Sequence, residues 1–191
     1  MQAIDRSELL TLGAYESIRD QFRARVIAAK ARRRVALGDH ITVLFENRDT
    51  VLLQIQEMLR TERITAEAGI QHEISTYNQL IPGLNELSAT LFIEYTDAPE
   101  RDRMLVALAG IEDKFYLRVN EVRCPVRNET GAADTSRTTA VHYVKFPLAP
   151  ELTLAWKSGK AEAALGVDHP HYRAETVLSA ATLATLAEDF A

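Results

Sequence analysis

Several residue types and motifs that mark common protein classes are scarce or absent in this 191-residue chain. The single cysteine, Cys124, cannot form an intrachain disulfide or supply a cysteine-rich metal site. No run of about 18 apolar residues is present, so the sequence predicts no membrane-spanning helix. Phosphate-binding glycine loops, dinucleotide fingerprints and nucleophile elbows are also missing. These absences remove the most easily recognised enzyme classes, but they leave enzymes in general undecided.

The balance of charge excludes a further class. The chain carries 22 Lys and Arg against 27 Asp and Glu, a formal net charge of −5 at pH 7. This balance argues against generic nucleic-acid binding, because phosphate contacts need a basic surface. The first ten residues, MQAIDRSELL, include acids and lack an apolar signal core, so we expect a cytoplasmic protein.

The patterns that are present mix helices with strands. Apolar residues recur at helical spacing over about 5–35 and predict an N-terminal helical segment, which Gly38 ends. Residues 36–191 combine helical runs with period-2 alternation. Strands are expected at 40–46, 87–96, 115–119 (which continues or folds back through 126), 138–146, 161–167 and 172–178, and helices at 97–109, 151–158 and 180–190. The polar stretch 128–137 predicts a surface loop. Together these elements predict a single α+β domain over 1–191, with a largely antiparallel sheet packed with several helices.

The strongest pattern lies in residues 45–70, FENRDTVLLQIQEMLRTERITAEAGI. Asn47 as N-cap and Gly69 as terminator predict a central helix. Its apolar arc, which we expect to be buried, consists of Val51, Leu52, Ile55, Met58 and Leu59. Leu53 and Ile64 lie roughly opposite that arc, so we expect cover from both sides, with a second subunit of a homodimer as one source.

Charged and amide side chains surround the apolar arc of the central helix. A charge at a buried rim must be paired or reach water. Frayed, solvated helix ends satisfy this requirement, and so does a polar pocket. In the pocket hypothesis, Arg48, Arg60 and Arg63 donate to a carboxylate or phosphate, because guanidinium binds such groups bidentately. The hypothesis completes this ligand site with two orienting carboxylates, Glu57 and Glu62, and two flanking amides, Gln54 and Gln56.

The histidines suggest a second kind of site. His142 shares a strand face with apolar residues, which favours a buried core histidine over a ligand or general base. His169 and His171 form an H-x-H pair around Pro170, a spacing that can aim both rings the same way. Imidazole suits iron or zinc, so His142, His169 and Glu62 form a candidate metal site. Cys124 lacks an activating partner, and we expect a small buried side chain there.

Several runs carry a resemblance: RVIAAKARRRVALGDHITVLFENRDTVLLQIQEMLRTERI, YNQLIP, ATLFIEY, TTAVHYVKF and VDHPHY. They resemble a bacterial family, domain of unknown function 3501, over nearly the whole chain. The resemblance implies no established activity. It does imply an association with a rubrerythrin-like di-iron protein and an iron–sulfur oxidoreductase. The family pattern touches Arg34, His40, Glu46, Arg48, Gln54, Gln56, Glu57, Arg60, Glu62, Arg63, Tyr77, Asn78, Pro82, His142, Asp168, His169, Pro170 and Tyr172.

Three hypotheses follow. The first is an accessory protein of a bacterial redox or oxidative-stress system, which binds a small anionic ligand or a redox partner through the central helix. The second is an iron- or zinc-binding protein or enzyme with a His/Glu site. The third is a structural scaffold in which the charged residues form surface and interface salt bridges.

Overall fold

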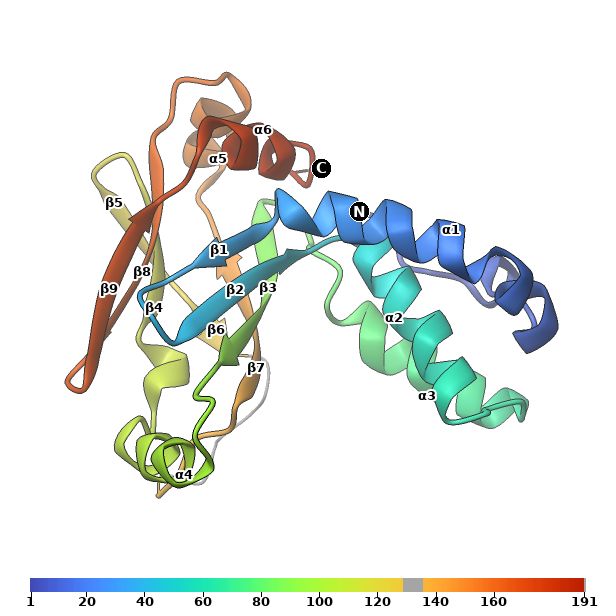
Figure 1. Ribbon diagram of the computed structural model, residues 1–191. Helices are drawn as coiled ribbons and strands as arrows, with labels where there is room; N and C mark the ends of the chain where they lie inside the picture. Colours follow the sequence, from blue (N-terminus) through green and yellow to red (C-terminus); the bar gives the residue numbers. More distant parts are fainter. Residues whose placement is uncertain (129–135, 191) are drawn as a thin grey trace.

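The computed structural model describes residues 1–128 and 136–190, and it contains two antiparallel sheets with helices around them (Figure 1). The first sheet has the order β1-β2-β3-β7-β6. Its strands are β1 Arg34–Ala36, β2 Ile41–Glu46, β3 Glu86–Ile93, β7 Val141–Pro147 and β6 Arg127–Asn128. The second sheet has the order β5-β4-β8-β9. Its strands are β5 Val122–Pro125, β4 Phe115–Val119, β8 Ala163–His169 and β9 Tyr172–Val177. The predicted α+β class with antiparallel pairing is confirmed.

Period-2 alternation explains how the two sheets pack into a sandwich. Val43 and Phe45 of β2 are buried on the inner face of the first sheet. Phe115 and Leu117 of β4 are buried on the inner face of the second sheet. These side chains belong to one hydrophobic cluster that draws residues from both sheets. Alternating strands bury one set of side chains between two sheets and direct the other set outward.

Hydrogen bonds join the two sheets at both edges of the sandwich. At one edge the chain passes from β5 to β6 through Val126, whose amide donates to the Phe115 carbonyl at 3.1 Å. At the other edge the Tyr172 hydroxyl donates to the Leu37 carbonyl at 2.7 Å. Gly38 follows with a φ of +69°, and a Cβ there would lie 2.5 Å from the Tyr172 hydroxyl oxygen. The β1–β2 turn therefore requires glycine for both its backbone and its space.

Helices η1 Arg6–Glu8, α1 Leu12–Ala31, α2 Arg48–Thr61 and α3 Glu67–Asn78 form a unit that projects to one side of the sandwich, here called the helical arm (Figure 1). The arm has hydrophobic clusters of its own. One contains Val51, Ile55 and Leu59 of α2 with Ile70 and Ile74 of α3. Tyr143 is the residue of the sheets that packs against this cluster. The arm and the sandwich therefore have separate cores.

The central helix begins as predicted and ends earlier than predicted. The Asn47 side chain accepts from the Thr50 amide at 3.0 Å, which confirms the N-cap. Helix α2 ends at Thr61 rather than at Gly69, which lies inside α3. Arg63 adopts φ +51°, and the Ile64 amide donates to the Leu59 carbonyl at 2.9 Å. This is a Schellman motif with arginine in place of glycine at the left-handed position. A helix end predicted from glycine alone therefore falls too late, at Gly69.

The prediction of cover on both sides of α2 is confirmed for Leu53, but the cover comes from the same chain. Leu53 packs with Tyr15 and Val26 of α1. A second subunit is not needed to explain its burial. The burial of Leu53 therefore no longer supports a homodimer, which stays a prediction.

The predicted N-terminal helical segment was too long at its C-terminal end. Helix α1 ends at Ala31, and Arg34–Ala36 pair with β2 as a strand. Arg33, between them, is 3% exposed and makes a bidentate ion pair with Asp189 at 2.6 and 2.8 Å. Arg32, Arg33 and Arg34 therefore do not all continue the helix, because Arg33 is held inside the protein.

The remaining helices cover the ends of the sandwich (Figure 1). Helix α4 Ala98–Ala107 and the 3-10 helix η2 Ile111–Asp113 lie at one end, and α5 Pro150–Lys157 and α6 Ala180–Ala187 at the other. Most of the loop predicted at 128–137 lies outside the described residues. Among the residues that are described, no helix combines the length and apolar character needed to span a bilayer.

Candidate functional site

The carboxylate of Glu57, predicted to orient a ligand, is instead bound within the arm. The Tyr15 hydroxyl donates to it at 2.6 Å, and the Arg19 guanidinium donates twice at 2.8 Å. The hydrogen bond from Arg19 is the main reason why the pKa of Glu57 lies below its ordinary value of 4.5. Glu57 therefore joins α2 to α1.

Two of the three predicted arginine donors also make ion pairs within the arm. Arg60 donates to the Glu16 carboxylate at 2.7 and 3.2 Å. Arg48 pairs with Glu8 and donates to the Gln2 carbonyl at 3.1 Å. These pairs tie α2 to the N-terminal part of the chain, as the structural hypothesis expects of the charged residues.

The other predicted ligand residues are distributed around α2. The Gln56 amide oxygen accepts from the Leu10 amide at 2.7 Å. Glu62 and Arg63 are exposed at the C-terminal end of the helix. Gln54 lies near the Tyr77 hydroxyl and opposes the rise that burial causes in the pKa of that phenol. Of the seven residues, Gln54 is the one that leads to the pocket described below.

The candidate metal residues lie in separate surroundings. His142 is 2% exposed, and its Nε2 lies 2.9 Å from both the Thr138 hydroxyl and the Thr139 carbonyl oxygen. Burial lowers the pKa of His142 below 6.5, and the charge of Glu112 opposes that shift. The expectation of a buried core histidine with hydrogen-bond partners is confirmed.

His169 uses both of its ring nitrogens locally. Its Nε2 lies 3.2 Å from the Ala109 carbonyl oxygen, and its Nδ1 accepts from the His171 amide at 3.2 Å. Glu62, the third member of the candidate site, stands exposed at the end of α2. Within residues 1–128 and 136–190, no group of three or more His, Cys, Asp or Glu side chains is placed to hold a metal ion.

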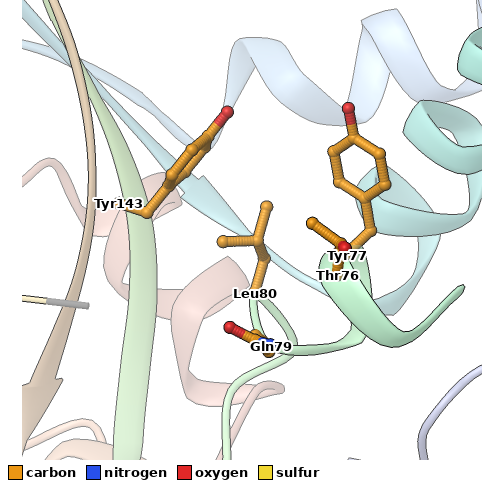
Figure 2. A pocket seen from close by; sticks show the side chains of 5 residues that line it. All are labelled: Thr76, Tyr77, Gln79, Leu80 and Tyr143. Atoms are coloured by element: carbon orange, nitrogen blue, oxygen red, sulfur yellow. The ribbon is translucent and has the colours of Figure 1, made fainter. Parts of the chain in front are cut away.

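A small pocket lies where the end of α3 meets strand β7 (Figure 2). It has a volume of about 140 Å³ and is here called the junction pocket. Its lining residues are Thr76, Tyr77, Gln79, Leu80 and Tyr143. Tyr77 and Tyr143 stand on opposite sides of Leu80, with both hydroxyl groups directed the same way (Figure 2). One wall therefore comes from the arm and the other from the sandwich.

A buried carboxylate lies next to the junction pocket on the outer face of the first sheet. Glu46 is 2% exposed and accepts from the Thr90 hydroxyl at 2.7 Å and from the Thr50 hydroxyl. Thr90 pairs with Tyr143 across β3 and β7. Burial raises the pKa of Tyr143, and the charge of Glu46 raises it further. The phenol that forms the sandwich wall therefore lies in the field of a carboxylate.

A larger cavity of about 370 Å³ lies between α5 and α6, and fewer polar side chains line it than line the junction pocket. Four alanines, Ala161, Ala180, Ala184 and Ala187, contribute to its lining. The Trp156 indole N–H is already used, because it donates to the Leu183 carbonyl at 2.9 Å. The junction pocket, with two phenols and an amide, is the better candidate for specific binding.

These features describe a protein in which an ion-paired helical arm on a two-sheet sandwich frames a small pocket. The family model described as "Protein of unknown function (DUF3501)" matches residues 3–190, so the chain belongs to the DUF3501 family. A crystal structure of a novel protein of unknown function from Burkholderia pseudomallei K96243 is similar over 100% of both chains, with 39% identity and a TM-score of 0.93. A comparison with curated proteins finds no match.

Residue patterns do not predict the junction pocket, although four of its five lining residues lie within the runs that carry the family resemblance. YNQLIP contains Tyr77, Gln79 and Leu80, and TTAVHYVKF contains Tyr143. Glu46 and Tyr77 are also among the positions that the family pattern touches. No local pattern places these two runs side by side, because they are joined only through the packing of α3 on the sheet.

Proposed function

We propose that this DUF3501 protein binds a small organic molecule in the junction pocket and acts as an accessory protein. The observation that carries the proposal is the pairing of Tyr77 from the arm with Tyr143 from the sandwich around one cavity. Ligand sites combine an apolar surface with a few polar groups and often lie where separately packed parts meet. Leu80 supplies the apolar surface here, and two phenols and the Gln79 amide supply the polar groups.

The size of the junction pocket limits the ligand. Its volume of about 140 Å³ is close to that of an engineered cavity of about 150 Å³ that binds benzene. The enclosed part of a ligand therefore contains on the order of six non-hydrogen atoms. A nucleotide or a peptide would have to lie mostly outside the pocket.

Fragment screening by NMR tests this proposal. The amide signals of Gln79 and Leu80 report on binding at the pocket. Thr76 is exposed on α3 and lines the pocket, so Thr76→Trp should fill it without disturbing a core. Ser75→Trp places the same side chain at an exposed neighbouring position outside the lining.

We expect fragments to shift these signals in the wild type and in Ser75→Trp, but not in Thr76→Trp. Equal binding to all three proteins would overturn the proposal. Fragments that shift only signals around Trp156 would also overturn it, because they would place binding in the α5–α6 cavity.

The cellular setting is proposed on the family resemblance alone. We propose an accessory role beside a rubrerythrin-like di-iron protein or an iron–sulfur oxidoreductase, most simply in the cytoplasm. Co-purification of either protein with the wild type, judged against Thr76→Trp, tests this role and asks whether the pocket takes part.

The metal alternative keeps its own test. Elemental analysis of untagged protein, with His142→Ala and His169→Ala as comparisons, decides whether iron or zinc is bound. Stoichiometric metal that both variants lose would favour that alternative over the pocket proposal.

A further inference from the structure

We propose that the junction pocket selects a small organic cation over neutral and anionic molecules of the same size. This inference rests on the proposed function and names the ligand class for the same pocket. It departs from the anionic ligand that the arginines of the central helix suggested, because Arg48 and Arg60 are paired elsewhere in the arm and Arg63 is exposed at the end of α2.

The first observation is the position of Glu46. Its side chain shares the outer face of the first sheet with Thr90 and Tyr143, through the pairing of β2, β3 and β7. The Glu46 carboxylate accepts hydrogen bonds from the hydroxyl groups of Thr50 and Thr90. Hydroxyl donors solvate a carboxylate without cancelling its charge, and a charge in a buried setting is screened weakly. Its field therefore reaches the pocket wall formed by Tyr143.

The arm contributes a second carboxylate. Glu73 lies one turn before Tyr77 on α3, which places both side chains on the same side of the helix. Burial raises the pKa of Tyr77, and the charge of Glu73 raises it further. Both phenols are therefore neutral near pH 7, and a carboxylate raises the pKa of each, Glu73 for Tyr77 and Glu46 for Tyr143. Neutral aromatic rings near negative charge attract cations through their faces.

Two of the nearby cations are bound by another carboxylate, Glu86. Lys145 shares the outer sheet face with Tyr143, and its ammonium donates to Glu86 at 2.8 Å. Arg127 donates to the other oxygen of Glu86 at 3.1 Å. The N-terminal ammonium of Met1 also lies nearby and donates to the Pro82 carbonyl at 3.4 Å, so three cations accompany Glu46, Glu73 and Glu86. Lys145 and Arg127 are bound to Glu86, whereas Glu46 and Glu73 act on the two phenols and disfavour an anionic ligand.

Three probes of similar size separate charge from shape: tetramethylammonium, tert-butanol and trimethylacetate. NMR titrations read at Gln79, Leu80 and the rings of Tyr77 and Tyr143 give the three affinities. We expect the cation to bind about tenfold more tightly than either other probe, the order expected for a unit charge several Å away at a partly buried site.

Two variants test whether Glu46 and Glu73 cause the preference for the cation. Glu46→Gln should lower affinity for tetramethylammonium several-fold and leave that for tert-butanol unchanged. Because Glu46 is buried, Glu73→Gln on the surface of α3 provides the same test without risk to folding. Glu151→Gln, on exposed α5, removes one negative charge far from the pocket and controls for net charge.

Equal affinities for the three probes, or a preference that survives both Glu46→Gln and Glu73→Gln, would overturn the inference and leave the pocket proposal standing. Failure of all three probes to shift the pocket signals would also overturn it. The fragment screen with Thr76→Trp and Ser75→Trp then decides separately whether the pocket binds anything.

Discussion

The sandwich and the helical arm are stabilised in different ways. The sandwich buries large apolar side chains from two sheets, including Phe45, Phe115 and Phe146, which are at most 2% exposed. Helix α1, by contrast, has 20 residues of which Tyr15 and Val26 alone are buried. Ion pairs hold it and η1 to α2, among them Arg19–Glu57, Arg60–Glu16 and Arg48–Glu8.

This difference explains where a binding site can form. A close-packed core leaves little room between its side chains. The boundary between two separately packed regions is less constrained, and the junction pocket lies there. The difference between the two regions also predicts that the arm unfolds before the sandwich under destabilising conditions.

The largest expected effect is in the sandwich core. Phe45→Ala should reduce the free energy of unfolding by about 3–5 kcal/mol, because it removes a fully buried ring between the sheets. Urea unfolding followed by circular dichroism measures the loss. Leu84→Ala, at a position 74% exposed, is the control and should change stability by less than about 0.5 kcal/mol. A similar loss in both variants would contradict the assigned core.

The buried pair of Arg33 and Asp189 should have the next largest effect. Asp189→Ala leaves the guanidinium buried without its partner and should cost about 3 kcal/mol or more. The double variant Arg33→Met/Asp189→Leu removes both charges and should recover much of that loss. Thermal unfolding of the three proteins checks this. If the double variant were less stable than Asp189→Ala, desolvation would not be the cause of the loss.

A substitution in the arm should cause a smaller loss of stability, and the loss should be confined to the arm. Glu57→Gln removes the charge that Arg19 and Tyr15 bind, and we expect a loss of about 1–2 kcal/mol. Hydrogen exchange should accelerate in α1 and α2 and remain unchanged in β2, β3 and β4. Uniform acceleration across both regions would show that the arm does not open by itself.

Acid should destabilise the arm more than the sandwich. The pKa values of Glu8, Glu16 and Glu57 are lowered from 4.5, chiefly by hydrogen bonds from Arg48, Arg60 and Arg19 respectively. A lowered folded-state pKa stabilises the fold above about pH 4.5, and this contribution is lost as the pH falls through the folded-state values.

Hydrogen exchange at pH 7 and at about pH 3.5, corrected for the intrinsic effect of pH on exchange, checks this prediction. Protection should be lost first in α1 and α2. Earlier loss in the sandwich, where Glu175 and Glu86 also have lowered pKa values, would reverse the comparison.

The smallest effect concerns the predicted ligand residues. The Arg60–Glu16 pair is largely exposed, so Arg60→Ala should cost at most about 1 kcal/mol. Fragment binding at the junction pocket should not change. Loss of binding with unchanged melting temperature would restore the ligand site on the central helix.

Local signals explain what the sequence could predict. The Asn47 cap and the strand predicted at 40–46 depend on neighbouring residues, and both are confirmed, the strand as Ile41–Glu46. Features set by distant contacts were missed. The strand at Arg34–Ala36 depends on pairing with β2, and the buried state of Arg33 depends on Asp189, 156 positions along the chain.

The candidate site shows the same limit. Arg48, Glu57 and Arg60 were singled out because unpaired charge at a helix rim suggests a ligand. Their partners, Glu8, Arg19 and Glu16, lie 38 to 44 residues away, so helical periodicity could not reveal the pairs. Tyr77 and Tyr143 come together only when the arm packs against the sheet.

Crystal soaking is the most direct test of the position of the proposed ligand. Crystals of the protein would be soaked with tetramethylammonium and with the strongest fragments from the NMR screen. We expect ligand density between Tyr77 and Tyr143, next to Leu80, and none in the cavity between α5 and α6. Density in the α5–α6 cavity with no ligand between the two phenols would contradict the proposed site.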